Sequence, residues 1–181
     1  WTRGLEVDGL VTSDDEPLPA KPHDIKTNAE SRKAWRRSAA RQHFENERKQ
    51  SKRLHALRVL SLTKKFSGQK IYEPMSMDFR GRGYYQPHFL NPQGPSFVKS
   101  CFLFHNPQRM NDVGVQWLCV HIANCWGHDK LAYEDRIKWT EQNKKMIMRI
   151  GKDPMGCMEW TKADDPWLFL PACNEFYLMH T

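Results

Sequence analysis

The stretch from Met75 to Tyr85 holds the side chains with the clearest chemistry in this 181-residue chain. Two arginines, Arg80 and Arg82, flank a glycine, which lets a ligand approach the backbone closely. Guanidinium groups bind phosphate through paired hydrogen bonds, and an aromatic ring such as that of Tyr84 can stack on a base. The segment is therefore suited to hold a phosphate backbone while a ring meets a base. We predict nucleic acid as its first candidate partner.

A structural alternative for this segment is a salt bridge between Asp78 and Arg82 across a tight turn. The charge of the neighbouring segment favours nucleic acid instead. Residues 28–66 carry twelve Lys or Arg against three Glu, a charge of +9, and the rest of the chain carries −2, which gives the net +7. Such a segment is often only a solvated face. Phosphate contacts along it would weaken steeply with salt.

The basic segment is predicted to be one helix. Asn28 or Thr27 can cap its start, Glu30 suits its first turn, and no Gly or Pro occurs before Gly68. A helix of about 38 residues would be about 57 Å long. Its apolar residues do not form sustained heptads, which argues against a coiled coil. Residues 1–27 contain an acidic cluster and three prolines, and we expect an extended linker there.

After Gly68 the pattern changes to short β-like runs that are separated by Gly, Pro and Asn turns. They predict a small antiparallel sheet, with residues 78–82 at a bend between strands. The runs are residues 71–77, 83–89 and 97–104.

Helices follow the sheet in the prediction, so the fold class is α+β, mainly α. Residues 112–126 and 133–150 have helical patterns, and the second helix is expected to end at Gly151. Asp153-Pro154 and Asp165-Pro166 each resemble an N-cap followed by a first-turn proline, which predicts two further helices.

Composition and missing motifs exclude several classes of protein. Five cysteines without a Cys-x-x-Cys pair support neither a disulfide framework nor a zinc ribbon and favour a reducing compartment. The longest apolar stretch is far below the roughly 20 residues that a membrane span needs. No set of nucleophile, base or paired carboxylates is complete, so we assign no catalytic residue.

The His and Cys residues near Cys119 do not predict a metal site. Cys119, His121, Cys125 and His128 are close in sequence, but on a helix we expect only Cys125 and His128 to share a face. We therefore predict core residues here and no metal ligands.

Several ordered motifs resemble the phage-type single-subunit DNA-directed RNA polymerases, the family of the T-odd phage enzymes and their mitochondrial relatives. The resemblance runs from about Pro22 to Tyr177. Its motifs are Lys21-Pro-His-Asp-Ile25, Asn28-Ala, Ala34-Trp35-Arg-Arg, Met77-Asp-Phe-Arg-Gly-Arg82, Phe89-Leu-Asn-Pro-Gln-Gly94, Lys99, His121-x-Ala-Asn-x-x-Gly-x-Asp-Lys130, Glu134-x-Arg136-Ile137-Lys138 and Asp165-Pro166.

The resemblance implies part of a right-hand polymerase fold. Residues 1–27 would be an extended linker from an N-terminal domain, 28–67 a thumb-like basic helix, and 68–181 the N-terminal part of an incomplete palm domain. Lys130 would contact the phosphates of the incoming nucleotide. The residues implied to contact the template and the RNA:DNA hybrid are Asp78, Phe79, Arg80, Gly81, Arg82, Tyr84 and Lys99.

The resemblance also implies a parent enzyme, a nucleotidyltransferase that carries out DNA-templated transcription with Mg²⁺. Its partners would be double-stranded DNA template, RNA:DNA hybrid and ribonucleoside triphosphates, without a membrane. The parent would be a monomer in the cytoplasm of a phage-infected bacterial host. Its catalytic aspartates would lie beyond Thr181, and both termini look cut, so we expect an internal fragment that is inactive alone. The alternatives are a non-catalytic nucleic-acid-binding clamp module and a structural interaction protein that bears a helix.

Overall fold

The computed structural model describes residues 15–181, so residues 1–14 of the predicted linker lie outside the described part. The chain divides into two compact units, Trp1–Lys65 and Phe66–Thr181. The described residues are mainly helical with one two-stranded antiparallel sheet, as the prediction of an α+β, mainly α fold requires. None of the helices in this part of the chain is both long enough and apolar enough to cross a membrane.

The first unit is built on one long helix, α2 (Ala29–Phe66), whose 38 residues confirm the predicted basic helix. Asn28 caps it, because its Oδ1 accepts hydrogen bonds from the main-chain N–H groups of Glu30 (2.9 Å) and Ser31 (3.3 Å). The Ser31 hydroxyl also donates to Asp24 at 2.6 Å, which lowers the pKa of that carboxyl. The start of the helix is thus fixed by side chains within a few residues of it.

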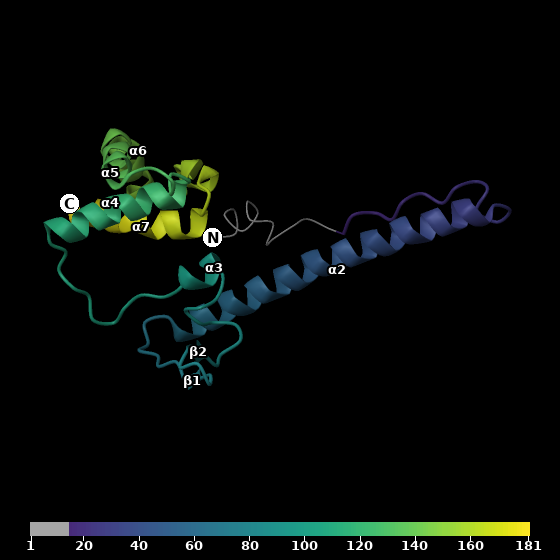
Figure 1. Ribbon diagram of the computed structural model, residues 1–181, viewed down its shortest axis with the longest axis horizontal. Coiled ribbons are helices and arrows are strands. Elements are labelled where there is room, and N and C mark those ends of the chain that lie inside the picture. Colours follow the sequence, from purple (N-terminus) through teal and green to yellow (C-terminus); the bar gives the residue numbers. More distant parts are fainter. Residues whose placement is uncertain (1–14) are drawn as a thin grey trace. The chain divides into compact units, whose positions relative to one another are not determined.

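Residues before the helix turn back and run beside it, as Figure 1 shows for the purple part of the chain. They have no regular secondary structure up to Pro22, as expected for an extended segment, but they are packed. The indole N–H of Trp35 donates to the Pro19 carbonyl at 2.8 Å. Glu16 pairs with Lys49 and accepts from Gln42 at 3.1 Å. The segment is therefore fastened to the helix at two points.

The sheet of the second unit is a hairpin of β1 (Met75–Met77) and β2 (Gly83–Tyr85). The third strand predicted at residues 97–104 is wrong, because this region begins with a short helix, α3 (Ser96–Lys99). The helical turn buries Phe97 and Val98 together, and the Phe97 ring meets Trp167 edge-on at 5.1 Å. Side chains of a strand alternate between two faces, so a strand could not bury both neighbours against one surface.

Helix α4 (Asp112–Trp126) has the predicted bounds. Asn111 caps its start, and Gly127 ends it with a φ of +114°, a left-handed conformation that favours glycine. The helix predicted at residues 133–150 is in fact two, α5 (Tyr133–Gln142) and α6 (Lys144–Lys152). They are separated at Asn143, whose side-chain amide donates to the Trp139 carbonyl at 2.8 Å.

The last helix, α7 (Pro166–Met179), begins at the predicted Asp165-Pro166 pair. The helix predicted at Asp153-Pro154 is wrong: a turn forms there, in which the Asp153 carboxylate accepts from the Gly156 N–H at 2.9 Å. A short 3-10 helix, η1 (Met158–Lys162), follows.

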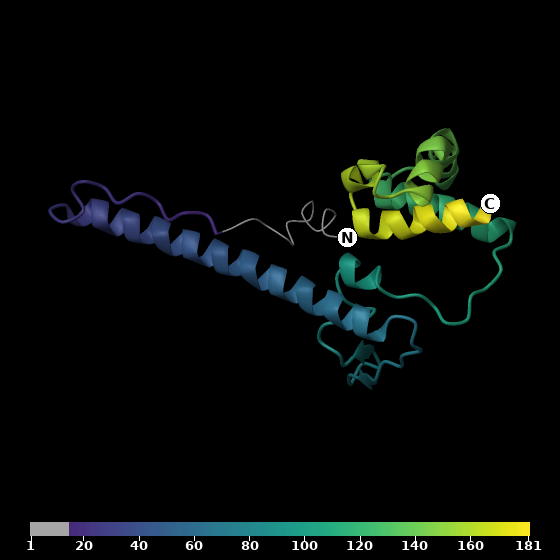
Figure 2. The same cartoon turned by 180° about the vertical axis from the view of Figure 1, so that it is seen from behind.

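The core of the second unit lies between α4, α6 and α7, and Figure 2 shows α4 and α7 side by side. Ile122, Ile150 and Phe169 are fully buried in it. Gly151 is also buried and lies inside α6, so its predicted role as a helix end is wrong. A Cβ atom there would lie 2.5 Å from the Cys173 carbonyl oxygen, so the absence of a side chain lets α6 approach α7.

Replacing Gly151 with Ala should therefore destabilise the protein by about 1–3 kcal/mol, because backbone atoms of α7 must move to admit the methyl group. The free energy of unfolding, measured with urea and followed by tryptophan fluorescence, checks this. Lys145→Ala, an exposed change on the same helix, is the control and should have little effect. Equal stability of the Gly151 variant and the control would contradict the close approach.

Candidate nucleic-acid interface

The Asp78 side chain closes the bend between β1 and β2. Its Oδ1 atom accepts hydrogen bonds from the main-chain N–H groups of Arg80 (2.8 Å) and Arg82 (2.9 Å). The Gly81 N–H donates to the Asp78 carbonyl at 3.0 Å, and Gly81 has a φ of +75°. Because the Asp78 N–H also donates to the Arg82 carbonyl at 3.0 Å, residues 79–81 form a three-residue loop, for which a turn followed by a left-handed glycine is common. The motif thus needs both its Asp and its Gly to hold this shape.

The two arginine side chains at this bend are exposed. Asp78 binds the main chain of Arg82 and forms no ion pair with its guanidinium in the described structure, so the structural alternative of a salt bridge is wrong. Arg80 lies over the Phe79 ring, with its guanidinium carbon 5.0 Å from the ring centre. The Phe79 side chain is 92% exposed, and the Tyr84 hydroxyl lies 3.5 Å from the Asp78 carboxylate. Cationic and aromatic groups thus face solvent together.

The other edge of β2 is held by Gln93. Its side-chain amide accepts from the Tyr85 N–H at 3.1 Å and donates to the Gly83 carbonyl at 3.0 Å, as a neighbouring strand would. Asn91 in turn accepts from the Gln93 N–H at 2.9 Å. The Asn-Pro-Gln-Gly motif therefore supports the strand that carries Tyr84.

Lys99 is the last residue of α3 and is exposed, so it lies on a helix and not on the predicted strand. The helix is held in place by Ser96, whose hydroxyl donates to the Asp165 carboxylate at 2.7 Å. Asp165 immediately precedes α7, so α3 is anchored to the start of that helix.

Lys130 lies in a turn between α4 and α5, where its side chain is exposed. The turn begins just after the Gly127 helix end, and the Leu131 N–H donates to the His128 carbonyl at 3.3 Å. Arg136, from the first half of α5, donates to the Leu131 carbonyl at 2.8 Å and to the Asp129 carbonyl at 2.6 Å. Both neighbours of Lys130 are therefore bound by one guanidinium group.

The His and Cys residues of α4 do not form a ligand set. No three His, Cys, Asp or Glu side chains converge on a common point in residues 15–181. The expectation that only Cys125 and His128 share a face was wrong, since His121 Nε2 lies 3.6 Å from Cys125 Sγ, as residues four apart on a helix can. Burial, and then the charge of Asp165, raises the pKa of Cys125 to about 12. The thiol therefore stays protonated and is a poor metal ligand.

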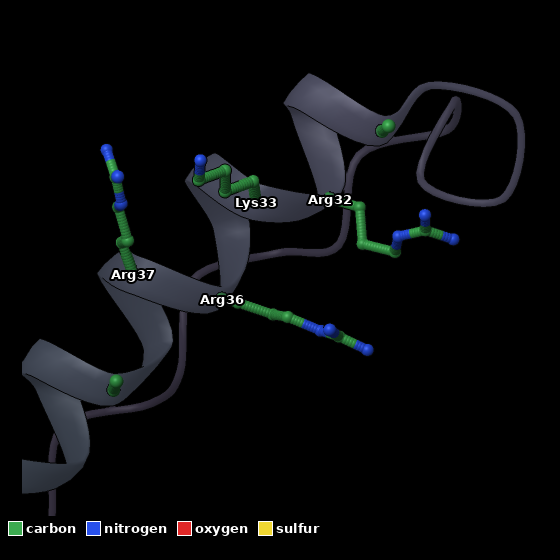
Figure 3. Close-up of a pocket in the computed structure, with 6 residues that line it drawn as sticks. Arg32, Lys33, Arg36 and Arg37 are labelled. Atoms are coloured by element: carbon green, nitrogen blue, oxygen red, sulfur yellow. The ribbon is translucent and has the colours of Figure 1, made fainter.

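A second basic surface lies in the first unit, on the first turns of α2. Figure 3 shows a groove between two pairs of cationic side chains, with Arg32 and Arg36 on one side and Lys33 and Arg37 on the other. The two members of each pair are four residues apart in sequence, so they lie on the same side of the helix, about one turn from each other. The groove is also lined by Ala29 and Ala40, whose side chains are small.

The structure thus brings most of the predicted nucleic-acid residues together at one bend, while Lys99 and Lys130 belong to other elements of the same unit. Two residues that hold these sites were not assigned a role from the sequence, Gln93 and Arg136. Both residues belong to motifs that the sequence shows, but neither motif tells which main-chain groups the side chain binds.

Comparison with known proteins gives a consistent result. Residues 108–180 match the family described as DNA-dependent RNA polymerase. The chain is 38% identical to a DNA-directed RNA polymerase of Enterobacteria phage K11, over 89% of this chain and 18% of the phage protein. It is 36% identical to the T7 RNA polymerase of Escherichia phage T7, over 94% of this chain and 19% of that enzyme.

The similarity extends to organelles. The mitochondrial DNA-directed RNA polymerase 1 of Arabidopsis thaliana is 33% identical over 96% of this chain and 18% of the plant protein. The chain spans about a fifth of the length of these relatives. The resemblance predicted from the motifs is confirmed: over most of its length the chain is similar in sequence to phage-type single-subunit DNA-directed RNA polymerases.

Proposed function

We propose that the chain is part of a DNA-directed RNA polymerase, in which it binds the template and the RNA:DNA hybrid and contacts the incoming ribonucleotide. The observation that carries the proposal is the bend at Asp78. There the carboxylate is satisfied by main-chain N–H groups, so the guanidinium groups of Arg80 and Arg82 are not used to neutralise it. Two cations on a fixed turn are suited to bind adjacent phosphates.

The exposed ring of Phe79 and the ring of Tyr84 add apolar surface beside these cations. A ring can stack on a base or pack on a sugar without reading sequence, which suits an enzyme that must accept every template. Lys99, exposed at the end of a helix that is anchored on α7, would add a further phosphate contact. We assign these roles to the hybrid and the template strand.

The basic helix α2 is proposed to be a thumb, and the second unit the beginning of a palm. The groove between the two cationic pairs of α2 supports this, because four positive side chains in two successive turns suit a phosphate backbone. Contacts of this kind carry no sequence information, as a clamp on moving nucleic acid requires. The segment before the helix, fastened at Trp35 and Glu16, would link the thumb to a preceding domain.

Catalysis in the whole enzyme is proposed to use Mg²⁺, held by carboxylates that this chain does not supply. The described residues do not fit the ion, since no three acidic or other ligating side chains converge among them. We propose that this chain alone is inactive. We propose that the whole enzyme is a monomer that transcribes double-stranded DNA in the cytoplasm of a phage-infected bacterium.

Replacing Arg80 and Arg82 together with Ala in the intact polymerase should weaken binding of an RNA:DNA hybrid. Each phosphate contact contributes close to one unit to the slope of log affinity against log salt, so the slope should become shallower by roughly two. Hybrid affinity, measured by fluorescence anisotropy at several salt concentrations, checks this.

The control for the arginine pair is Lys145→Ala with Lys152→Ala, which removes two exposed cations from α6 and leaves the bend intact. This control should keep most of the affinity and slope. Unchanged affinity in the arginine variant, or an equal loss in the control, would contradict a contact at the bend and indicate only a general effect of net charge.

Replacing Lys130 with Met should raise the KM for ribonucleoside triphosphates by roughly tenfold, the value of one hydrogen bond to a charged group. Affinity for the hybrid should not change, because the lysine is proposed to meet the nucleotide alone. Nucleotide titrations in a single-nucleotide extension assay check this, with Lys130→Arg as the variant that keeps the charge. Loss of hybrid affinity at constant KM would contradict the nucleotide contact and indicate that Lys130 binds the nucleic acid.

A further inference from the structure

All three nitrogens of the Arg136 guanidinium group form hydrogen bonds around the Lys130 turn. Its Nε donates to the Leu131 carbonyl at 2.8 Å, one terminal nitrogen donates to the Asp129 carbonyl at 2.6 Å, and the other donates to the side-chain oxygen of Asn124 at 3.0 Å. Two acceptors are the carbonyl groups on either side of Lys130, and the third belongs to the last turn of α4. One side chain therefore joins the turn to both flanking helices.

These bonds are stronger than the bond that the turn makes for itself. The Leu131 N–H reaches the His128 carbonyl only at 3.3 Å, whereas the guanidinium bonds are shorter and charge-assisted. The guanidinium carbon also lies 5.0 Å from the centre of the Tyr133 ring, which meets Trp117 edge-on at 5.4 Å. We call these guanidinium bonds the Arg136 brace. The brace is itself held in place by an aromatic pair.

We propose that Arg136 is a positioning residue that fixes the turn and so aims the Lys130 ammonium group at the triphosphate of the incoming nucleotide. The inference rests on the proposed role of Lys130. All three nitrogens of the guanidinium group are held on protein acceptors around the turn, so we assign Arg136 an action through the turn and not a contact with the substrate. A lysine could not replace it, because an ammonium group lacks the planar fork that reaches three separated acceptors.

The test compares Lys130→Met, Arg136→Lys and the double variant in the intact polymerase. Arg136→Lys keeps the charge but loses the fork, and should raise the KM for ribonucleoside triphosphates by roughly tenfold, as Lys130→Met does, with little change in kcat or hybrid affinity. The double variant should have no higher KM than Lys130→Met alone, because Arg136 is proposed to affect nucleotide binding only through the lysine. Lys138→Met, whose lysine pairs with Asp135 on the same helix, is the control and should behave as wild type.

The outcomes separate the two proposals. A raised KM in Lys130→Met with a normal KM in Arg136→Lys would overturn the positioning role and leave the nucleotide contact standing, and additive effects in the double variant would do the same. A normal KM in Lys130→Met would contradict the nucleotide contact, and the positioning role would fall with it.

A measurement without activity tests the brace directly. Hydrogen exchange at the amides of residues 128–132 should be at least several-fold faster in Arg136→Lys than in wild type, with α4 and α7 unchanged, because the turn loses its strongest bonds. Equal protection of this turn in both proteins would overturn the proposal even if catalysis were altered. The control Lys138→Met should exchange as wild type does.

Discussion

The proposed interface depends on one hydrogen-bonding choice, in which the Asp78 carboxylate binds main-chain N–H groups and not the arginine side chains beside it. An exposed ion pair contributes little to stability, but bonds to two amides of the same turn fix its backbone. Gly81 completes the turn with a positive φ. Arg80 and Arg82 therefore project from a rigid bend with their charge available, and Gln93 keeps the strand behind them in register.

The turn that carries Lys130 is held in the same way, but by a charge of the opposite sign. There a cation, Arg136, satisfies two main-chain carbonyl groups, whereas at the hairpin an anion, Asp78, satisfies two main-chain N–H groups. In each case one charged side chain is used to hold a loop, and a neighbouring cation is left exposed. Loops that must present charge to phosphates can in this way be ordered without neutralising the charge that they present.

The helices of the second unit supply the fixed base for α3 and for the turn that carries Lys130. Asp165 accepts from the Ser96 hydroxyl at 2.7 Å, and its main-chain N–H donates to the Cys125 carbonyl at 2.9 Å, so the start of α7 is joined to α3 and α4. The near contact of α6 and α7 at Gly151 sets the distance between those helices. A closely packed interior of this kind is barely compressible, which suits elements that are proposed to place a lysine accurately.

The sequence by itself determined the long basic helix and the bounds of α4, because caps and helix-ending glycines act within a few residues of where they occur. The tertiary structure decided the rest. The short helix at Ser96–Lys99 replaced a predicted strand because Phe97 packs on Trp167, far along the chain. Similarly, no local pattern could show that Arg136 binds the carbonyl groups around Lys130, since the direction of a side chain follows from how the chain turns between two helices.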